Sequence, residues 1–274
     1  MTTKTCDTCA HGEGEGTIRF CRVKNGAAFH ANTRCDWWTQ PGQAICGVMT
    51  ATIESDGLTF DIQPNESHLI DDTKEELARY EGPLNVVVDV GAHAGTFALR
   101  AARMAAHVYA VEPSPLNLQI LRRNTKRNRL EPFVEIIEKA VATESGKLVS
   151  LRMGSPFPGQ KSIAFKKSKK VDCEVWTVSL SELLGTVLSK HETVDYLKVD
   201  IEGEEFEIAD GPAVPELSRC RYVSISLHSP TNEAYFEFGD GRTQEEYYES
   251  MLDWMKRSGI ANARIHSHMA IGTF

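Results

Sequence analysis

The stretch that decides the fold runs from Asn85 to Pro113 and reads NVVVDVGAHAGTFALRAARMAAHVYAVEP. It opens with apolar residues 86–90, a short β-branched run typical of a strand buried on both faces of a parallel sheet. A turn of small residues follows, and then an Ala-, Leu- and Arg-rich segment at residues 96–105 that is typical of a helix. A second apolar run at residues 108–111 is predicted to form the next strand. The stretch therefore predicts a β-turn-α-β unit.

The turn in this unit has the spacing Asp89-x-Gly91-x-x-x-Gly95. Glycines there let the backbone approach a ligand closely, because they carry no side chain. His93 stands where a dinucleotide-binding G-x-G-x-x-G turn has its middle glycine, which argues against a pyrophosphate and for a smaller nucleoside. Glu112 ends the second strand, where an ionised carboxylate can accept two hydrogen bonds from a ribose diol. Together these residues predict a binding site for S-adenosylmethionine.

Three motifs resemble those of the FkbM family of class I, Rossmann-like methyltransferases. They are Asp-Val-Gly-Ala-His-Ala-Gly at residues 89–95, the pair Glu112-Pro113, and Lys-Val-Asp-Ile-Glu-Gly-Glu-Glu at residues 198–205. The resemblance covers about residues 50–270 and departs from the family pattern at the cysteine-bearing N-terminus and in the turn, where the family usually has Asn in place of the histidine. It implies an α/β fold with a mostly parallel, Rossmann-like methyltransferase sheet whose last strand is antiparallel.

Composition sets the size and class of the protein. The chain has 274 residues, 41% of them hydrophobic and 25% charged, which fits one large α/β domain with a small appendage. We predict a cysteine-rich segment at residues 1–46, a cover segment at residues 47–82 and the methyltransferase domain at residues 83–274. Because the N-terminus is polar and no apolar run has the length of a membrane span, we expect a cytoplasmic protein without a membrane partner.

The first segment carries Cys6, Cys9, Cys21 and Cys35 among Gly, Thr and Asn residues, with little apolar periodicity. Such a segment cannot bury enough surface to fold unaided, whereas a structural metal contributes on the order of 10 kcal/mol. Four thiolates, two of them in a Cys-x-x-Cys pair, can close a tetrahedral zinc site. An iron–sulfur cluster is the alternative, because four cysteines serve either group.

Local patterns predict further elements around the central unit. Alternation around Asp56-Gly57 predicts a β-hairpin at residues 48–62, and two extended runs predict another at residues 147–177. A short helix is expected at residues 72–80. Ser114 is predicted to cap a helix that begins with proline.

The adenine side of the cofactor site is predicted from the third strand, at residues 133–138. Many related methyltransferases have an acidic residue at the position that corresponds to Lys139, just before Ala140 of this chain. We therefore expect the adenine to be contacted by the backbone or by Glu138. The complete set of predicted cofactor-binding residues is Asp89, Gly91, His93, Gly95, Glu112, Pro113, Glu138, Ala140 and Asp200.

The predicted catalytic residues are Asp200, Glu204 and His228. Asp200 ends the fourth strand and His228 ends the fifth, so both reach the edge of the sheet where open α/β sheets bind ligands. Glu202 and Glu204 follow Asp200, and crowded carboxylates require a cation or protons to relieve their repulsion. Either His228 or Asp200 acts as general base, or Asp200, Glu204 and His228 hold a divalent cation that polarises the acceptor.

The resemblance implies O-methylation of a small-molecule or sugar hydroxyl. One alternative is an RNA-modifying methyltransferase that docks nucleic acid through the cysteine segment and basic patches, and another is a non-catalytic regulator that binds the cofactor. The net charge of −8 disfavours general binding of nucleic acid. A run of lysines in the second predicted hairpin could contact an anionic substrate or RNA, or simply be solvated. These lysines are Lys161, Lys166, Lys167, Lys169 and Lys170.

Overall fold

A computed structural model of the chain divides into two compact units, residues 1–51 with 63–65 and residues 52–62 with 66–274. The residues that it describes are 12–13, 18–21, 27–30, 50–63, 66–153, 161–163, 171–228 and 242–273. In the first unit it shows a small antiparallel sheet of β1 (Gly12–Glu13), β2 (Ile18–Cys21) and β3 (Ala27–His30), with β2 in the middle. The division of the chain at residues 46 and 82 stays a prediction.

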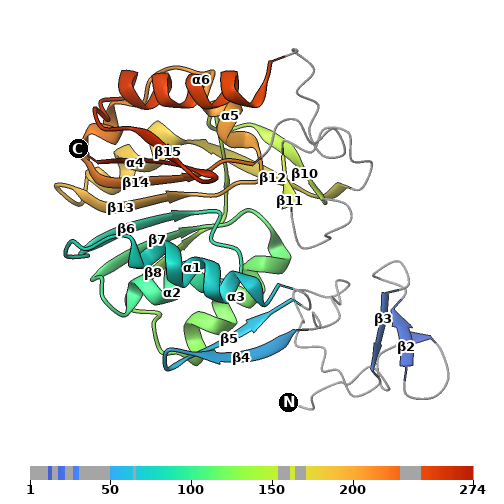
Figure 1. The fold of residues 1–274 in the computed structure, drawn as a ribbon. Coiled ribbons are helices and arrows are strands. Elements are labelled where there is room, and N and C mark those ends of the chain that lie inside the picture. Colours follow the sequence, from blue (N-terminus) through green and yellow to red (C-terminus); the bar gives the residue numbers. More distant parts are fainter. Residues whose placement is uncertain are drawn as a thin grey trace. The chain divides into compact units, whose positions relative to one another are not determined.

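The second unit is built on a seven-stranded sheet in the order β15-β16-β14-β13-β6-β7-β8 (Figure 1). All neighbouring pairs are parallel except those of β16, which is antiparallel to both β14 and β15. This confirms the predicted Rossmann-like methyltransferase sheet with an antiparallel last strand. The strands are β6 (Val86–Val90), β7 (His107–Val111), β8 (Val134–Ile137), β13 (Val194–Val199), β14 (Cys220–Ser226), β15 (Arg264–His266) and β16 (Met269–Thr273).

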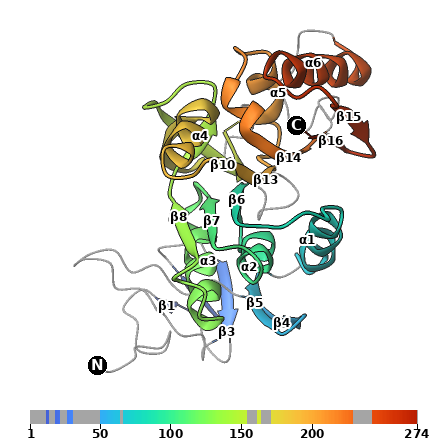
Figure 2. The same ribbon diagram turned by 90° about the vertical axis from the view of Figure 1, so that its left-hand side faces the viewer.

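Helices cover both faces of this sheet, as Figures 1 and 2 show. One face is covered by α1 (His68–Ala78), α2 (Thr96–Ala102) and α3 (Pro115–Arg127). The other is covered by α4 (Leu180–Leu188), α5 (Glu204–Ala209) and α6 (Gln244–Arg257), with a short 3₁₀ helix at Pro215–Arg219. Ser114 caps α3 as predicted, because its side chain accepts a hydrogen bond from Asn117 N. The expected helix at residues 72–80 begins earlier, at His68, because Ile70 is also buried on its inner face.

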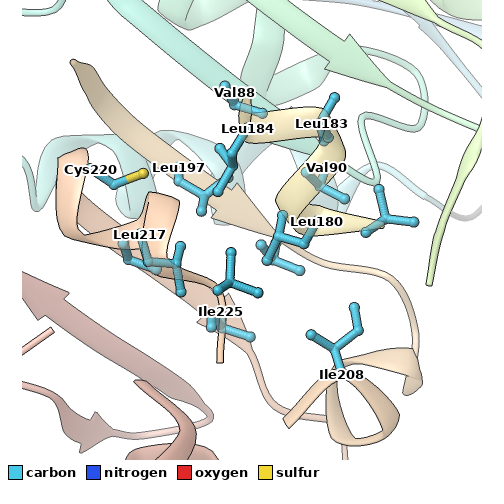
Figure 3. Close-up of a cluster of buried hydrophobic side chains, with 14 of the residues drawn as sticks. Val88, Val90, Leu180, Leu183, Leu184, Leu197, Ile208, Leu217, Cys220 and Ile225 are labelled. Atoms are coloured by element: carbon cyan, nitrogen blue, oxygen red, sulfur yellow. The ribbon is translucent and has the colours of Figure 1, made fainter. Parts of the chain in front are cut away.

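The largest apolar core lies between the sheet and helices α4 to α6. Every second residue of β6 contributes to it, and Val88 and Val90 meet Leu180, Leu183 and Leu184 of α4 (Figure 3). These side chains are all buried, so this face of the sheet is held mainly by the hydrophobic effect.

The opposite face of the sheet is partly polar. Asp89 of β6 and Ser224 of β14 flank Lys198 of β13 in register, and all three are buried. Glu76 of α1 accepts a hydrogen bond from the Ser224 hydroxyl (2.8 Å). A band of charged and polar groups therefore crosses the sheet and leads toward the ends of its central strands.

Two smaller sheets, separate from the central one, contain the predicted hairpins. Strands β4 (Ala51–Ser55) and β5 (Leu58–Ile62) pair around the Asp56-Gly57 turn. Strands β10 (Leu148–Met153) and β12 (Val171–Ser179) pair antiparallel within a separate sheet that also contains β9 (Ala140–Ala142) and β11 (Lys161–Ser162). Among the described residues, no helix combines the length and apolar character that a membrane span requires.

Candidate functional site

The carboxyl ends of the central strands bring the predicted site residues to one edge of the sheet. Gly91 follows β6, Glu112 follows β7, Asp200 follows β13, and His228 lies two residues beyond β14. The order of strands reverses between β6 and β13, and such a switch point is where open α/β sheets bind ligands.

The glycine turn is packed against the loop that carries Asp200. Gly91 has a φ of +84°, and a Cβ atom at this position would overlap the Asp200 carbonyl oxygen. Asp200 N donates to Val90 O (2.9 Å), so the two loops also share a backbone hydrogen bond. Gly95 has a φ of +85°, and a Cβ atom there would overlap side chains of α2 and α3. Atoms of the protein, and not a ligand, occupy the positions that side chains at these glycines would take. This close packing holds the turn beside Asp200.

Glu112 holds the turn in place from the end of the next strand. Its buried carboxylate accepts hydrogen bonds from His93 N (2.9 Å), Ser114 N (2.8 Å) and the Asn117 amide (3.3 Å). Oε2 accepts one of these bonds and keeps a lone pair for a ligand hydroxyl. Its predicted contact with the ribose, and that of the adjacent Pro113, remain predictions.

His93 of the turn lies beside Glu66, a neighbour that the sequence alone does not indicate. It adopts a positive φ of +51°, and its Nε2 atom lies 3.5 Å from Glu66 Oε1, just before α1. His93 Nδ1 and Glu66 Oε2 are both buried and form no hydrogen bond with the described residues. Burial alone lowers the pKa of His93, but the carboxylates of Glu66, Glu112 and Glu202 raise it above its usual value. Buried polar atoms without a partner at a ligand-binding edge fit a polar ligand such as the amino acid part of S-adenosylmethionine.

Asp89 is buried beneath the turn, with no exposed surface. Neither carboxylate oxygen accepts a hydrogen bond of ordinary geometry from the described residues, and Lys198 Nζ lies 3.7 Å from Oδ1. Burial raises the pKa of Asp89 to about 6, although Lys198 opposes the shift. The ammonium of Lys198 also donates to Asp200 Oδ2 (3.0 Å), so one buried cation is shared by two carboxylates.

The residues predicted to contact the adenine lie further along the edge. Glu138 is exposed and forms an ion pair with Arg122 of α3, while Ala140 is buried in β9 of the smaller sheet. The role of both residues in binding adenine stays a prediction.

Beside the turn, Asp200, Glu202 and His228 form a compact cluster. One candidate ligand atom from each lies within 4.8 Å of the others. His228 Nε2 is 3.5 Å from Asp200 Oδ1 and 3.4 Å from Glu202 Oε2. On the other side of the ring, Nδ1 is 3.1 Å from Glu205 Oε1. Glu205 also accepts hydrogen bonds from the backbone N–H groups of Ile201 and Gly203. The imidazole is therefore surrounded by three carboxylates.

The cluster contains one residue that the predicted catalytic set does not include, and the catalytic role of Glu204 stays a prediction. Glu202, rather than Glu204, lies beside Asp200 and His228. Glu202 has a φ of +57°, and Gly203 has a φ of +107°. These two positive φ values turn the chain sharply before α5, so that Glu204 becomes the buried first residue of that helix. The sequence places both acids near Asp200, but spacing alone does not indicate the positive φ of Glu202.

The charges of the cluster shift its pKa values in opposite directions. Burial alone lowers the pKa of His228, but the carboxylates of Glu205, Glu202 and Asp200 raise it to about 10. Burial alone raises the pKa of Asp200, but Lys198 and His228 hold it below its usual value. For Glu202, burial raises the pKa more than His228 lowers it. These shifts favour a protonated His228 and an ionised Asp200 at neutral pH.

The predicted metal ligands Cys6, Cys9 and Cys35 lie outside the described residues, and Cys21 ends β2 with no described side-chain position. The zinc site and its iron–sulfur alternative therefore stay predictions.

Comparison with known proteins identifies the family of the chain. The model of the FkbM methyltransferase domain matches residues 89–260, which is more than half of the chain. Methyltransferase sdnD of Sordaria araneosa is 25% identical over 174 residues, covering 53% of this chain and 67% of that protein. Ribosomal protein L11 methyltransferase of Carboxydothermus hydrogenoformans is 38% identical over 65 residues, covering 23% of this chain and 21% of that protein. The chain thus matches about a fifth of the length of this second relative.

Two solved structures that are similar to the chain have low sequence identity to it. Methyltransferase FkbM from Methylobacillus flagellatus is 15% identical with a TM-score of 0.44, covering 70% of this chain and 44% of that one. TYW2 from M. jannaschii, solved in complex with AdoMet, is 12% identical with a TM-score of 0.44, covering 84% of this chain and 88% of that one.

The sheet order, the glycine turn at its switch point and the acid after β7 define a Rossmann-like methyltransferase domain that uses S-adenosylmethionine. The chain belongs to the FkbM methyltransferase family.

Proposed function

We propose that the protein transfers a methyl group from S-adenosylmethionine to a hydroxyl group of a small molecule or a sugar. The observation that carries this proposal is the direct contact between the glycine turn and the Asp200 loop, through the Asp200 N to Val90 O hydrogen bond (2.9 Å). A methyl donor held at the turn has Asp200, Glu202 and His228 as neighbours. A hydroxyl acceptor must lose a proton, and such groups can receive or stabilise it. The resemblance to FkbM methyltransferases, which act on hydroxyls, supports the same reaction.

Each part of the site has a distinct task in this proposal. S-adenosylmethionine supplies a methyl group made electrophilic by its sulfonium. The Gly91 turn and Glu112 hold the adenosyl part, and His93 with Glu66 offers unpaired polar atoms to the remainder. Because alignment of donor and acceptor accounts for much of the rate in such displacements, the contact between the two loops supports catalysis by fixing Asp200 relative to the turn.

The proton of the acceptor hydroxyl goes to the cluster beyond the turn. With its pKa raised to about 10, metal-free His228 is a hydrogen-bond donor at neutral pH. Asp200 is ionised and accessible, so it fits the role of proton acceptor better than His228 does in that state. A cation bound to the same residues would instead lower the pKa of the acceptor hydroxyl.

The proposal is tested by following a tritiated methyl group from labelled S-adenosylmethionine to a panel of hydroxyl-bearing metabolites and glycans, with total RNA alongside. Asp200→Asn is expected to lower kcat for a hydroxyl acceptor by at least about 100-fold, because it removes the charge that receives the proton. Asp253→Asn, which makes the same chemical change at an exposed position on α6, is the matched control and should leave kcat unchanged.

Other outcomes favour the alternatives. Label that enters RNA and no hydroxyl compound would support the RNA-modifying function. Binding of the donor without transfer to any acceptor would support a regulator, and failure of the folded protein to bind the donor would refute all three functions.

A further inference from the structure

The cluster of Asp200, Glu202 and His228 has the composition and spacing of a metal site. Each residue offers one ligand atom, and the His228 Nε2 atom lies 3.4–3.5 Å from the two carboxylate oxygens. Ligands at about 2.0–2.2 Å from a metal ion are separated from each other by distances of this size. The three atoms can therefore contact one ion with little movement.

The fourth residue, Glu205, fixes the imidazole in the orientation that a metal requires. Its Oε1 atom lies 3.1 Å from His228 Nδ1, and the same side chain is held by the N–H groups of Ile201 and Gly203. Metal-binding histidines almost always have their second nitrogen held by a carboxylate or carbonyl in this way. Glu205 thus directs the Nε2 atom toward Asp200 and Glu202.

The balance of charge around the cluster gives an independent reason for a cation. Asp89, 0% exposed and without a hydrogen bond of ordinary geometry to the described residues, shares Lys198 with Asp200. In the described part of the chain, Lys198 and His228 are the basic side chains that form ion pairs with Asp89, Asp200, Glu202 and Glu205. His93 adds a second imidazole whose charge acts on Asp200 and Glu202. Four carboxylates thus face at most three positive charges, and buried carboxylates require compensation by positive charge.

We propose that Asp200, Glu202 and His228 bind a divalent transition-metal cation such as Mn²⁺, with Glu205 as the residue that positions His228. The two carboxylate oxygens suit Mn²⁺ as they suit Mg²⁺ or Ca²⁺, whereas the imidazole nitrogen favours a transition metal over those two cations. Three protein ligands leave coordination positions open, as catalytic sites do. The use of an open position by the acceptor oxygen rests on the proposed methyl transfer, whereas the cation site itself does not.

Mn²⁺ is the appropriate probe because the N-terminal cysteines would compete for a softer ion such as Zn²⁺. The full chain is treated with a chelator, dialysed and titrated with Mn²⁺, and free Mn²⁺ is followed by electron paramagnetic resonance without methyl donor or acceptor. We expect saturable binding in the wild-type protein. Glu202→Gln should weaken binding by more than about tenfold, because loss even of a residue that only orients a ligand weakens metal binding by 10- to 100-fold.

Glu131→Gln is the matched control, since it makes the same chemical change at an exposed position just before β8 and should leave Mn²⁺ affinity unchanged. Asp200→Asn provides a second ligand variant, and circular dichroism establishes that each variant is folded. The proposal is overturned if the folded wild-type protein does not bind Mn²⁺ at millimolar concentration. It is equally overturned if binding survives both ligand substitutions, or is lost in Glu131→Gln and retained in Glu202→Gln. Because no methyl transfer is measured, this result is separate from the test of the proposed reaction.

Discussion

Each end of the central sheet contains a buried aspartate, and the two carboxylates differ in the partners that the chain gives them. At the amino end, Asp195 of β13 accepts hydrogen bonds from Asn85 N (2.8 Å) and Val86 N (2.9 Å) and pairs with Arg221. Toward the carboxyl end, Asp89 has no hydrogen bond of ordinary geometry to the described residues and shares Lys198 with Asp200. The first carboxylate is satisfied by the chain and serves the fold. The second shares its ion-pair partner Lys198 with another carboxylate, and burying it in that arrangement opposes stability.

The largest effect is expected from a substitution at Gly91, at the carboxyl end of the sheet, which tests this difference between the two ends. Gly91→Ala would force a Cβ atom into the Asp200 carbonyl oxygen, so one of the two loops must move. We expect the free energy of unfolding to fall by more than about 4 kcal/mol and binding of S-adenosylmethionine to be lost. Urea unfolding and titration calorimetry measure the two effects.

Gly146→Ala is the control for that substitution. Gly146 also has a positive φ (+73°), but a Cβ atom there would meet no described atom within 4 Å. The free energy of unfolding of Gly146→Ala should therefore fall only by the backbone strain of about 1 kcal/mol, and the variant should keep its affinity for the cofactor. Equal losses in the two variants would mean that backbone conformation, and not contact between the loops, makes glycine necessary at position 91.

The amino end can be tested with Asp195→Ala. This change leaves the N–H groups of Asn85 and Val86, the second of which is buried, without an acceptor, and should lower the free energy of unfolding by about 3 kcal/mol. Because Asp195 lies at the end of the sheet away from the Gly91 turn, the affinity for S-adenosylmethionine should stay within about twofold. A cofactor affinity that falls with stability would contradict the division between the two ends.

A smaller effect, of opposite sign, is expected for Asp89→Asn. The pKa of Asp89 is raised from 3.8 to about 6 by burial, so the folded state binds more protons than the unfolded state between those values. This carboxyl therefore lowers the free energy of unfolding as pH rises from about 4 to about 6, and its penalty is constant above that. Asp89→Asn should be the more stable protein at pH 8 by on the order of 2 kcal/mol, and the advantage should vanish near pH 4.

Chemical unfolding of both proteins across this pH range provides the measurement, and the difference between them isolates Asp89 from other titrating groups. If the difference were independent of pH, the buried carboxyl would not be titrating in the folded protein. Added S-adenosylmethionine should stabilise the wild-type protein more than the variant if Asp89 supports the cofactor turn as predicted.

Much of the fold could be predicted because its signals are local. The β-branched run of β6, the glycine turn and the acid after β7 lie within one stretch, and the cap at Ser114 is set by neighbouring residues. The site was harder to predict, because its decisive contacts join distant segments. His93 meets Glu66 across the start of α1, and Gly91 meets the backbone of Asp200, more than a hundred residues along the chain.

The sequence by itself determined the order of strands and helices, the position of the glycine turn and the family, because periodicity and short motifs reflect local conformation and burial. The tertiary structure alone decided that Glu202 rather than Glu204 joins Asp200 and His228, and that Glu205 holds the imidazole. The reason is that the direction of an acidic side chain in this loop depends on the backbone angles of Glu202 and Gly203. The same loop is held by hydrogen bonds from Ile201 N and Gly203 N to Glu205 and from Asp200 N to Val90 O of β6, and spacing along the chain does not reveal these contacts.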